Sequence, residues 1–155
     1  MAEVCGTAWI ETARDKVVAL MDALMATMAT GYDPTFSYVY EKHGTADIRL
    51  NAVSVGIASQ PEDRPLWSGQ HTSFWFIEFS IRVHTAYAGD NILIDDQKNS
   101  RLLNSVIEKL QANRNLEDNY RIHEITGANP ALEFGLTTGG EVTFIVTVPI
   151  EYTQE

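Results

Sequence analysis

The sequence has 155 residues, of which 45% are hydrophobic and 21% are charged, a composition typical of one globular domain rather than of a disordered chain. Aspartate and glutamate total 21 against 11 lysines and arginines, so the formal net charge is −10. No run of basic residues is present, and this excludes the usual sequence signature of proteins that hold nucleic-acid phosphates. The acidic balance indicates either simple solubility or a surface that lies near DNA without binding it.

The sequence also indicates the cellular compartment in which the protein is expected. Cys5 is the single cysteine, so no disulfide can form within the sequence and a reducing compartment is expected. No stretch approaches the roughly 20 apolar residues that span a bilayer. The first residues carry Glu3 and no basic leader, so we expect no secretory signal. These features predict a soluble protein that is made in a cytoplasm and has no membrane partner.

The first predicted element is a helix over residues 7–29. Its apolar residues recur every three or four positions, as on one face of a helix. They are Ile10, Ala13, Val17, Leu20, Met21, Leu24 and Met28. Gly31 then favours a helix end, and Asp33-Pro34 favours a turn.

Two strands and a loop are predicted next. Residues 35–42 alternate aromatic and polar side chains, as a strand does, and residues 47–58 form a second strand. The apolar residues of the second strand change side after Ala52, which predicts a bulge or a bend. Residues 59–73 carry two prolines and a glycine and are predicted to be a long loop.

The strongest pattern is the strand over residues 74–87. One side of it is apolar, and the other side is expected to be solvated. The apolar side is Trp75, Ile77, Phe79, Ile81 and Val83, and the polar side is Glu78, Ser80, Arg82 and His84. Phe74 and Phe76 make the polar side apolar at the start of the strand, so something must cover them. The cover is either the 59–73 loop, with Leu66 and Trp67 on top, or a neighbouring subunit, which we favour.

The remaining elements are a helix and two strands. Asp95 and Asp96 predict the start of a helix over residues 96–112, because carboxylates stabilise a helix N-terminus. A weaker strand follows over 119–126, then a glycine-rich loop over 127–140 and a last strand over 142–152. Pro149 lacks a backbone donor, which predicts that this last strand ends at an edge of the sheet.

The order of elements predicts an α+β fold in a single domain over residues 1–155. Two helices with apolar stripes need one apolar sheet face to cover. We therefore expect a mostly antiparallel β-sheet of about five strands, with the two helices packed on one face.

No catalytic motif is recognisable. The four histidines, His43, His71, His84 and His123, show no metal-ligand spacing, and no nucleotide-binding or nucleophile motif is present. His84 is expected to be a solvated residue of the sheet. We therefore predict that the protein is not an enzyme, with no catalytic residues, no cofactor and no metal.

One series of elements is distinctive: a long strand with Arg82, Val83, His84 and Thr85, a short turn, and a helix that ends with Leu110, Asn113 and Leu116. A strand near 122–125 and the final VTFIVTV strand follow. Together these elements resemble the tail terminator, or tail completion, proteins of tailed bacteriophages. The resemblance covers the whole order of elements and is densest from Phe74 to Tyr152.

This resemblance implies a structural virion protein of the phage tail or neck. Such subunits close into a hexameric ring that caps the tail tube, ends its polymerisation and joins it to the head connector, while DNA passes through the centre. The implied partners are copies of the same protein, the tail tube protein and the head connector. Phe74, Phe76, Leu66 and Trp67 are the candidate residues of the subunit or tube interface. Two other classes stay open: another phage neck or head-completion protein, and a small non-viral ligand-binding domain that uses the space between sheet and helices.

Overall fold

The structure is a computed structural model, and it describes residues 8–32, 35–36, 38–43, 49–58, 62–65, 73–87, 96–135 and 137–149. Two helices and six strands lie within these residues. The helices are α1 (Ala8–Gly31) and α2 (Asp96–Ala112). The strands are β1 (Tyr38–Tyr40), β2 (Ala52–Ile57), β3 (Glu62–Pro65), β4 (Ser73–Tyr87), β5 (Arg121–Glu133) and β6 (Thr137–Pro149).

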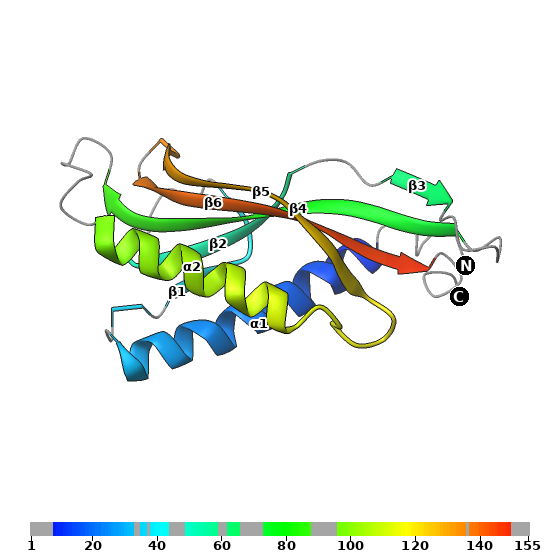
Figure 1. Cartoon of the computed structure of the whole chain (residues 1–155), viewed down its shortest axis with the longest axis horizontal. Helices are drawn as coiled ribbons and strands as arrows, with labels where there is room; N and C mark the ends of the chain where they lie inside the picture. Colours follow the sequence, from blue (N-terminus) through cyan, green and yellow to red (C-terminus); the bar gives the residue numbers. More distant parts are fainter. Residues whose placement is uncertain are drawn as a thin grey trace.

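The six strands form one sheet. Its main order is β1-β2-β4-β6-β5, and the short β3 pairs separately with the beginning of β4. β1 and β2 are parallel, whereas all the other pairs are antiparallel. Both helices lie on the same side of this sheet (Figure 1). The predicted α+β fold, with a mostly antiparallel sheet and two helices on one face, is therefore confirmed.

The hydrophobic core fills the space between the helices and the sheet. α1 contributes Trp9, Ala13, Val17, Met21, Leu24, Met25 and Met28, and α2 contributes Leu102, Leu103, Val106 and Leu110. The sheet contributes chiefly Val53, Val55, Ile77, Phe79, Ile81, Val83, Val142, Phe144, Val146 and Val148. Burial of this many apolar side chains is the dominant favourable contribution to folding. The alternating pattern of the 74–87 strand predicted its core side correctly.

The chain turns sharply after α2 through three residues in the left-handed conformation. Glu117, Asp118 and Asn119 have φ values of 72°, 53° and 69°. Aspartate and asparagine adopt this conformation more readily than most non-glycine residues. The turn is held by Leu116 N–H, which donates to Tyr120 O at 2.9 Å. Asp118 also accepts a hydrogen bond from Lys16 of α1 at 2.9 Å, so the turn is tied to the first helix.

The loop predicted over residues 127–140 was wrong, because this stretch belongs to β5, a tight turn and β6. Gly139 lies where a side chain does not fit, since a Cβ atom there would be 1.7 Å from Val83 O. Pro130 is tolerated because β5 is an edge strand and its pairing is irregular between Asn129 and Leu132. Gly139 and Pro130 therefore mark close packing and an edge strand, and not the predicted loop.

The other boundaries differ in smaller ways. The predicted 59–73 loop contains β3, which pairs with β4, while Leu66 and Trp67 lie outside the described residues. The predicted 35–42 strand is reduced to the three residues of β1. Asn51 has a φ of 59°, so the chain bends just before β2. At the other end of the sheet, β5 pairs with β6 only as far as Thr147, so Pro149 is at an edge, as predicted.

Candidate functional site

Every second side chain of β4 faces away from the helices, and we call this side the outer face of the sheet. The outer-face residues of β4 are Phe74, Phe76, Glu78, Ser80, Arg82 and His84. Their chemistry changes along the strand, from two phenylalanines at the start to hydroxyl, guanidinium and imidazole groups further on. The outer face therefore holds two separate candidate sites, one at each end of β4.

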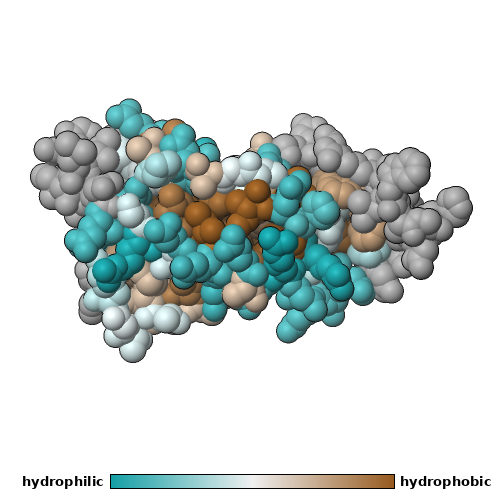
Figure 2. All heavy atoms as spheres, viewed as in Figure 1, coloured by the Kyte–Doolittle hydropathy of each residue, from teal (hydrophilic) through white to brown (hydrophobic). Residues whose placement is uncertain are grey.

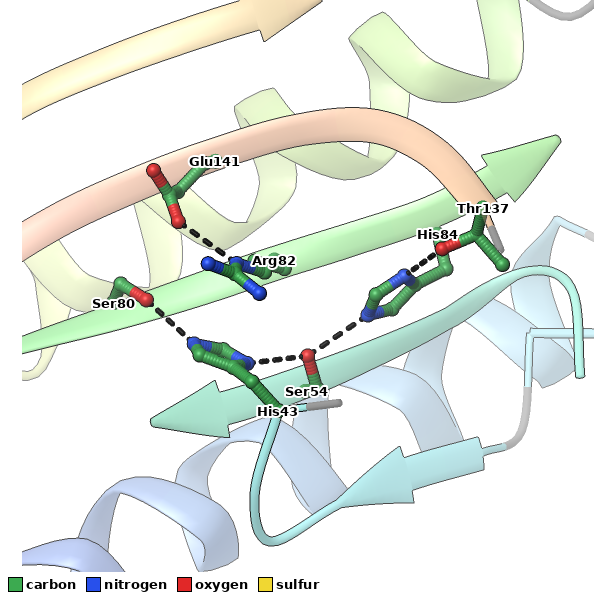
Figure 3. Close-up of polar contacts among 7 residues, drawn as sticks. All are labelled: His43, Ser54, Ser80, Arg82, His84, Thr137 and Glu141. Carbon is green, nitrogen blue, oxygen red and sulfur yellow. Dashed lines mark hydrogen bonds and ion pairs between the residues drawn. The ribbon is translucent and has the colours of Figure 1, made fainter. Parts of the chain in front are cut away.

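A network of five side chains lies at the far end of β4, and we call it the histidine network (Figure 3). His43 contacts Ser80 Oγ through Nε2 at 2.6 Å and Ser54 Oγ through Nδ1 at 2.7 Å. Ser54 Oγ in turn lies 2.8 Å from His84 Nε2, and His84 Nδ1 lies 2.6 Å from Thr137 Oγ1. Both ring nitrogens of both histidines are thus hydrogen-bonded, so the rings are fixed in orientation.

The shared hydroxyl of Ser54 couples the two imidazole rings. A hydroxyl carries a single proton, so Ser54 can donate to only one of the two ring nitrogens that face it. The other nitrogen, either Nδ1 of His43 or Nε2 of His84, must then carry a proton and donate to Ser54 Oγ. The tautomer of one histidine therefore limits the tautomer of the other.

Both histidines are neutral at physiological pH. Burial lowers the pKa of His43 to about 4, and the positive charge of Arg82 acts in the same direction. Burial likewise lowers the pKa of His84 to about 4, with His43 and then Arg82 as further causes. A proton on either ring would place a cation in a poorly solvated site that already contains a guanidinium group.

Two turns cover the histidine network. His43 reaches it from the turn after β1 and lies against Gly56, where a Cβ atom would be 2.3 Å from the imidazole ring. Phe134 lies in the turn after β5, with Arg82 over its ring at 4.9 Å and the His84 ring against it at 5.3 Å. Arg82 Nε also donates to Glu141 at 3.0 Å.

The prediction that His84 is solvated was wrong, because only 1% of the residue is exposed. The alternation of β4 was interpreted correctly, but it could not reveal that two distant turns fold over this part of the outer face. No spacing in the sequence relates His43 to His84, so the network could not be predicted from the sequence.

A serine beside a histidine is the pairing that activates a nucleophile. In this network the three hydroxyl residues, Ser54, Ser80 and Thr137, are at most 3% exposed. A substrate carbonyl cannot reach an oxygen that is buried under two turns. The arrangement therefore fixes the turns to the sheet, and it does not present a reactive group.

The second candidate site lies at the start of β4. Phe76 is only 6% exposed, and its ring meets the His123 ring edge-on at 5.7 Å. Phe74 is half-buried and borders a hollow of about 500 Å³, which we call the Phe74 hollow. The hollow is lined by Phe74, Arg114, Asn115, Arg121, Ile122, His123 and Thr147. Of the four predicted interface residues, Phe74 and Phe76 thus lie on the outer face, and Leu66 and Trp67 are outside the described residues.

The Phe74 hollow combines an aromatic ring with positive charge. Arg114 and Arg121 are both exposed, and neither forms an ion pair with a carboxylate in the part of the protein that the structure describes. Within the described ranges, the side chain of Arg114 donates to the carbonyl oxygen of His123, at 3.4 Å. Such a hollow suits a partner that carries carboxylates. Among the described residues, no group of three or more histidine, cysteine or acidic side chains could hold a metal ion.

The helix side of the molecule shows a third surface feature. Hydrophobic side chains gather in the middle of the view in Figure 2, between the sheet and α2, with hydrophilic side chains around them. Ile107 of α2 and Ile125 of β5 are only partly buried against the core.

Neither helix in the described part of the protein is long and apolar enough to cross a membrane.

A scan against protein-family models finds no match for this sequence, and a comparison with curated proteins finds none either.

Proposed function

We propose that this protein is a subunit of the tail terminator ring of a tailed bacteriophage, located in the virion at the end of the tail tube. The proposal starts from the sequence resemblance between Phe74 and Tyr152. The fold supports it, because both helices cover one side of the sheet and leave the outer face at the start of β4 for contact with another molecule.

The observation that carries the proposal is the outer face at the start of β4. Phe74 is half-buried there beside two arginines that have no carboxylate partner among the described residues. Aromatic and arginine side chains are the residues that most often dominate the binding energy of protein interfaces. A ring subunit needs such a surface, and a monomeric protein does not.

The alternative of a small ligand-binding domain has less support. A ligand-binding domain of this kind needs an open space between the sheet and the helices. In this protein the hydrophobic core fills that space with side chains from both layers. Another neck or head-completion protein of similar size remains the closer alternative, since it would use the same kind of surface.

The test is the mass of the protein in solution, measured by light scattering and accompanied by negative-stain images. We expect hexameric rings, at least when the end of the tail tube is present. A protein that stays monomeric at high concentration and also fails to bind purified tail tube would rule out the terminator function. Genes for the tail tube and tape-measure proteins just downstream would support the terminator over another neck protein.

A further inference from the structure

The net negative charge of this protein opposes its assembly into a ring. Each copy carries a formal net charge of −10, so identical copies repel one another unless surfaces of opposite sign meet. A contact that brings a basic patch of one subunit against an acidic patch of the next would offset this repulsion.

The basic patch is the Phe74 hollow. Three of the other described cations are already engaged: Lys16 with Asp118, Arg82 with Glu141, and Arg101 over the ring of Tyr32. Arg114 and Arg121 line the same hollow and have no carboxylate partner among the described residues.

The acidic patch is the solvent side of α1. Glu11, Asp15 and Asp22 are exposed and are spaced by four and seven residues, so they lie along one side of the helix. None of the three forms an ion pair with a described residue. Burial, and then the nearby charge of Glu41, raise the pKa of Asp22, so a fourth carboxylate lies near this side of the helix.

The two patches lie on opposite sides of the sheet. α1 covers the core side, where Trp9 stacks on Trp75 at 5.7 Å, and Phe74 next to Trp75 points to the outer face. A contact between two different patches is heterologous, and heterologous contacts form a ring when the rotation from copy to copy closes.

We propose that the Phe74 hollow binds the acidic side of α1 of a neighbouring copy, with Arg114 and Arg121 against Glu11 and Asp15. This inference rests on the proposed ring function and specifies which surfaces form the ring. Phe74 would supply the apolar part of the contact. The ion pairs would determine which side of each subunit faces the next copy around the ring.

The experiment is a charge exchange in the full chain. We expect the Arg114→Glu/Arg121→Glu variant and the Glu11→Arg/Asp15→Arg variant each to weaken ring formation by roughly tenfold or more in dissociation constant. Combining all four substitutions should restore ring formation, because the opposite charges then meet again. The Lys42→Glu/Lys109→Glu variant makes the same change in net charge outside the Phe74 hollow, and it should assemble nearly as the wild type does.

The outcomes separate this inference from the function on which it rests. Ring formation that survives the arginine reversals, or that the fourfold variant fails to restore, overturns the inference while the ring function stands. A wild-type protein that is monomeric even with tail tube present overturns both. Circular dichroism checks that each variant is folded. Arg114→Gln/Arg121→Gln, expected to weaken rings less than the reversal, replaces the arginine reversal if that variant is not folded.

Discussion

His43 and His84 show how single residues hold distant parts of this fold together. His43 belongs to the turn after β1, Ser54 to β2, His84 to β4 and Thr137 to the start of β6, and each is hydrogen-bonded to the next. Removing one partner from such a buried network leaves the others unsatisfied, which costs about 1–3 kcal/mol for each group. The network therefore stabilises the far end of the sheet only while both rings are neutral.

The first prediction is that acid weakens the fold through these two histidines. Their folded pKa of about 4 lies below the ordinary value of 6.5, so the unfolded chain takes up protons first as the pH falls. The stabilisation is complete above pH 6.5 and is lost progressively down to about pH 4. The slope is at most about 1.4 kcal/mol per pH unit for each histidine. Urea unfolding between pH 7.5 and pH 4 measures it.

The matched variants are His84→Gln and His123→Gln. Glutamine at position 84 can form hydrogen bonds but does not titrate, so the variant should be less stable at pH 7 and should lose less stability between pH 6.5 and 4. His123 is exposed on β5 and lies outside the histidine network, so its replacement controls for the loss of one histidine. Equal slopes for wild type and His84→Gln would show that His84 is not responsible.

At the scale of elements, β4 combines a core side of constant character with an outer face that changes from aromatic to polar. The core side packs against both helices along most of the strand. The outer face is covered at its polar end by turns of the same chain, and Phe76 is covered in part by His123. Phe74 is therefore the phenylalanine of the outer face of β4 that remains partly exposed.

The second prediction separates these two phenylalanines. The sequence alone led us to expect that Phe74→Ser and Phe76→Ser would both leave the subunit folded and weaken ring closure. With Phe76 only 6% exposed, Phe76→Ser should instead lower the free energy of unfolding by about 3 kcal/mol. Phe74→Ser should leave the fold nearly unchanged and weaken each subunit contact by about 2 kcal/mol, roughly thirtyfold.

Thermal unfolding followed by circular dichroism reports the fold of each variant, and light scattering reports its assembly. Ile57 is 48% exposed at the end of β2, so Ile57→Ser is a control for the loss of an exposed apolar side chain. If Phe74→Ser unfolds the subunit, Phe74 belongs to the fold. If it forms rings at the same concentration as the wild type, the interface lies elsewhere.

At the scale of the whole molecule, the charge is the dominant property. A formal net charge of −10 keeps the protein soluble and repels other polyanions. Such a surface suits the lining of a passage through which DNA moves without being held, which is the role proposed for the ring.

The third prediction is that the protein shows no measurable binding to duplex DNA at physiological salt. Affinity for the phosphate backbone comes from cations that displace counterions, and the two arginines of the Phe74 hollow are too few to outweigh the acidic surface. A gel-shift assay at low and physiological salt measures this. Tight binding that weakens steeply with salt would contradict the prediction and would favour a packaging or regulatory role.

The sequence by itself determined the helices, the core side of β4 and the fold class. These features depend on local periodicity, because a helix or a strand must place its apolar residues on one side to bury them. Both helices agree with the predicted ranges within two residues. The apolar residues of the 74–87 strand point to the core as their alternation required.

Only the tertiary structure decided how the outer face is covered. His84 is buried because His43 and Phe134, 41 and 50 residues away in the sequence, fold over it. The glycine-rich 127–140 stretch forms strands because it pairs with β4 and within itself, and Gly139 fits there because a Cβ atom would meet Val83 O. The arginines of the Phe74 hollow meet because β5 returns beside the turn that follows α2. Each of these outcomes depends on contacts between residues far apart in the chain. The local pattern of apolar and polar residues does not indicate which distant residues will be in contact.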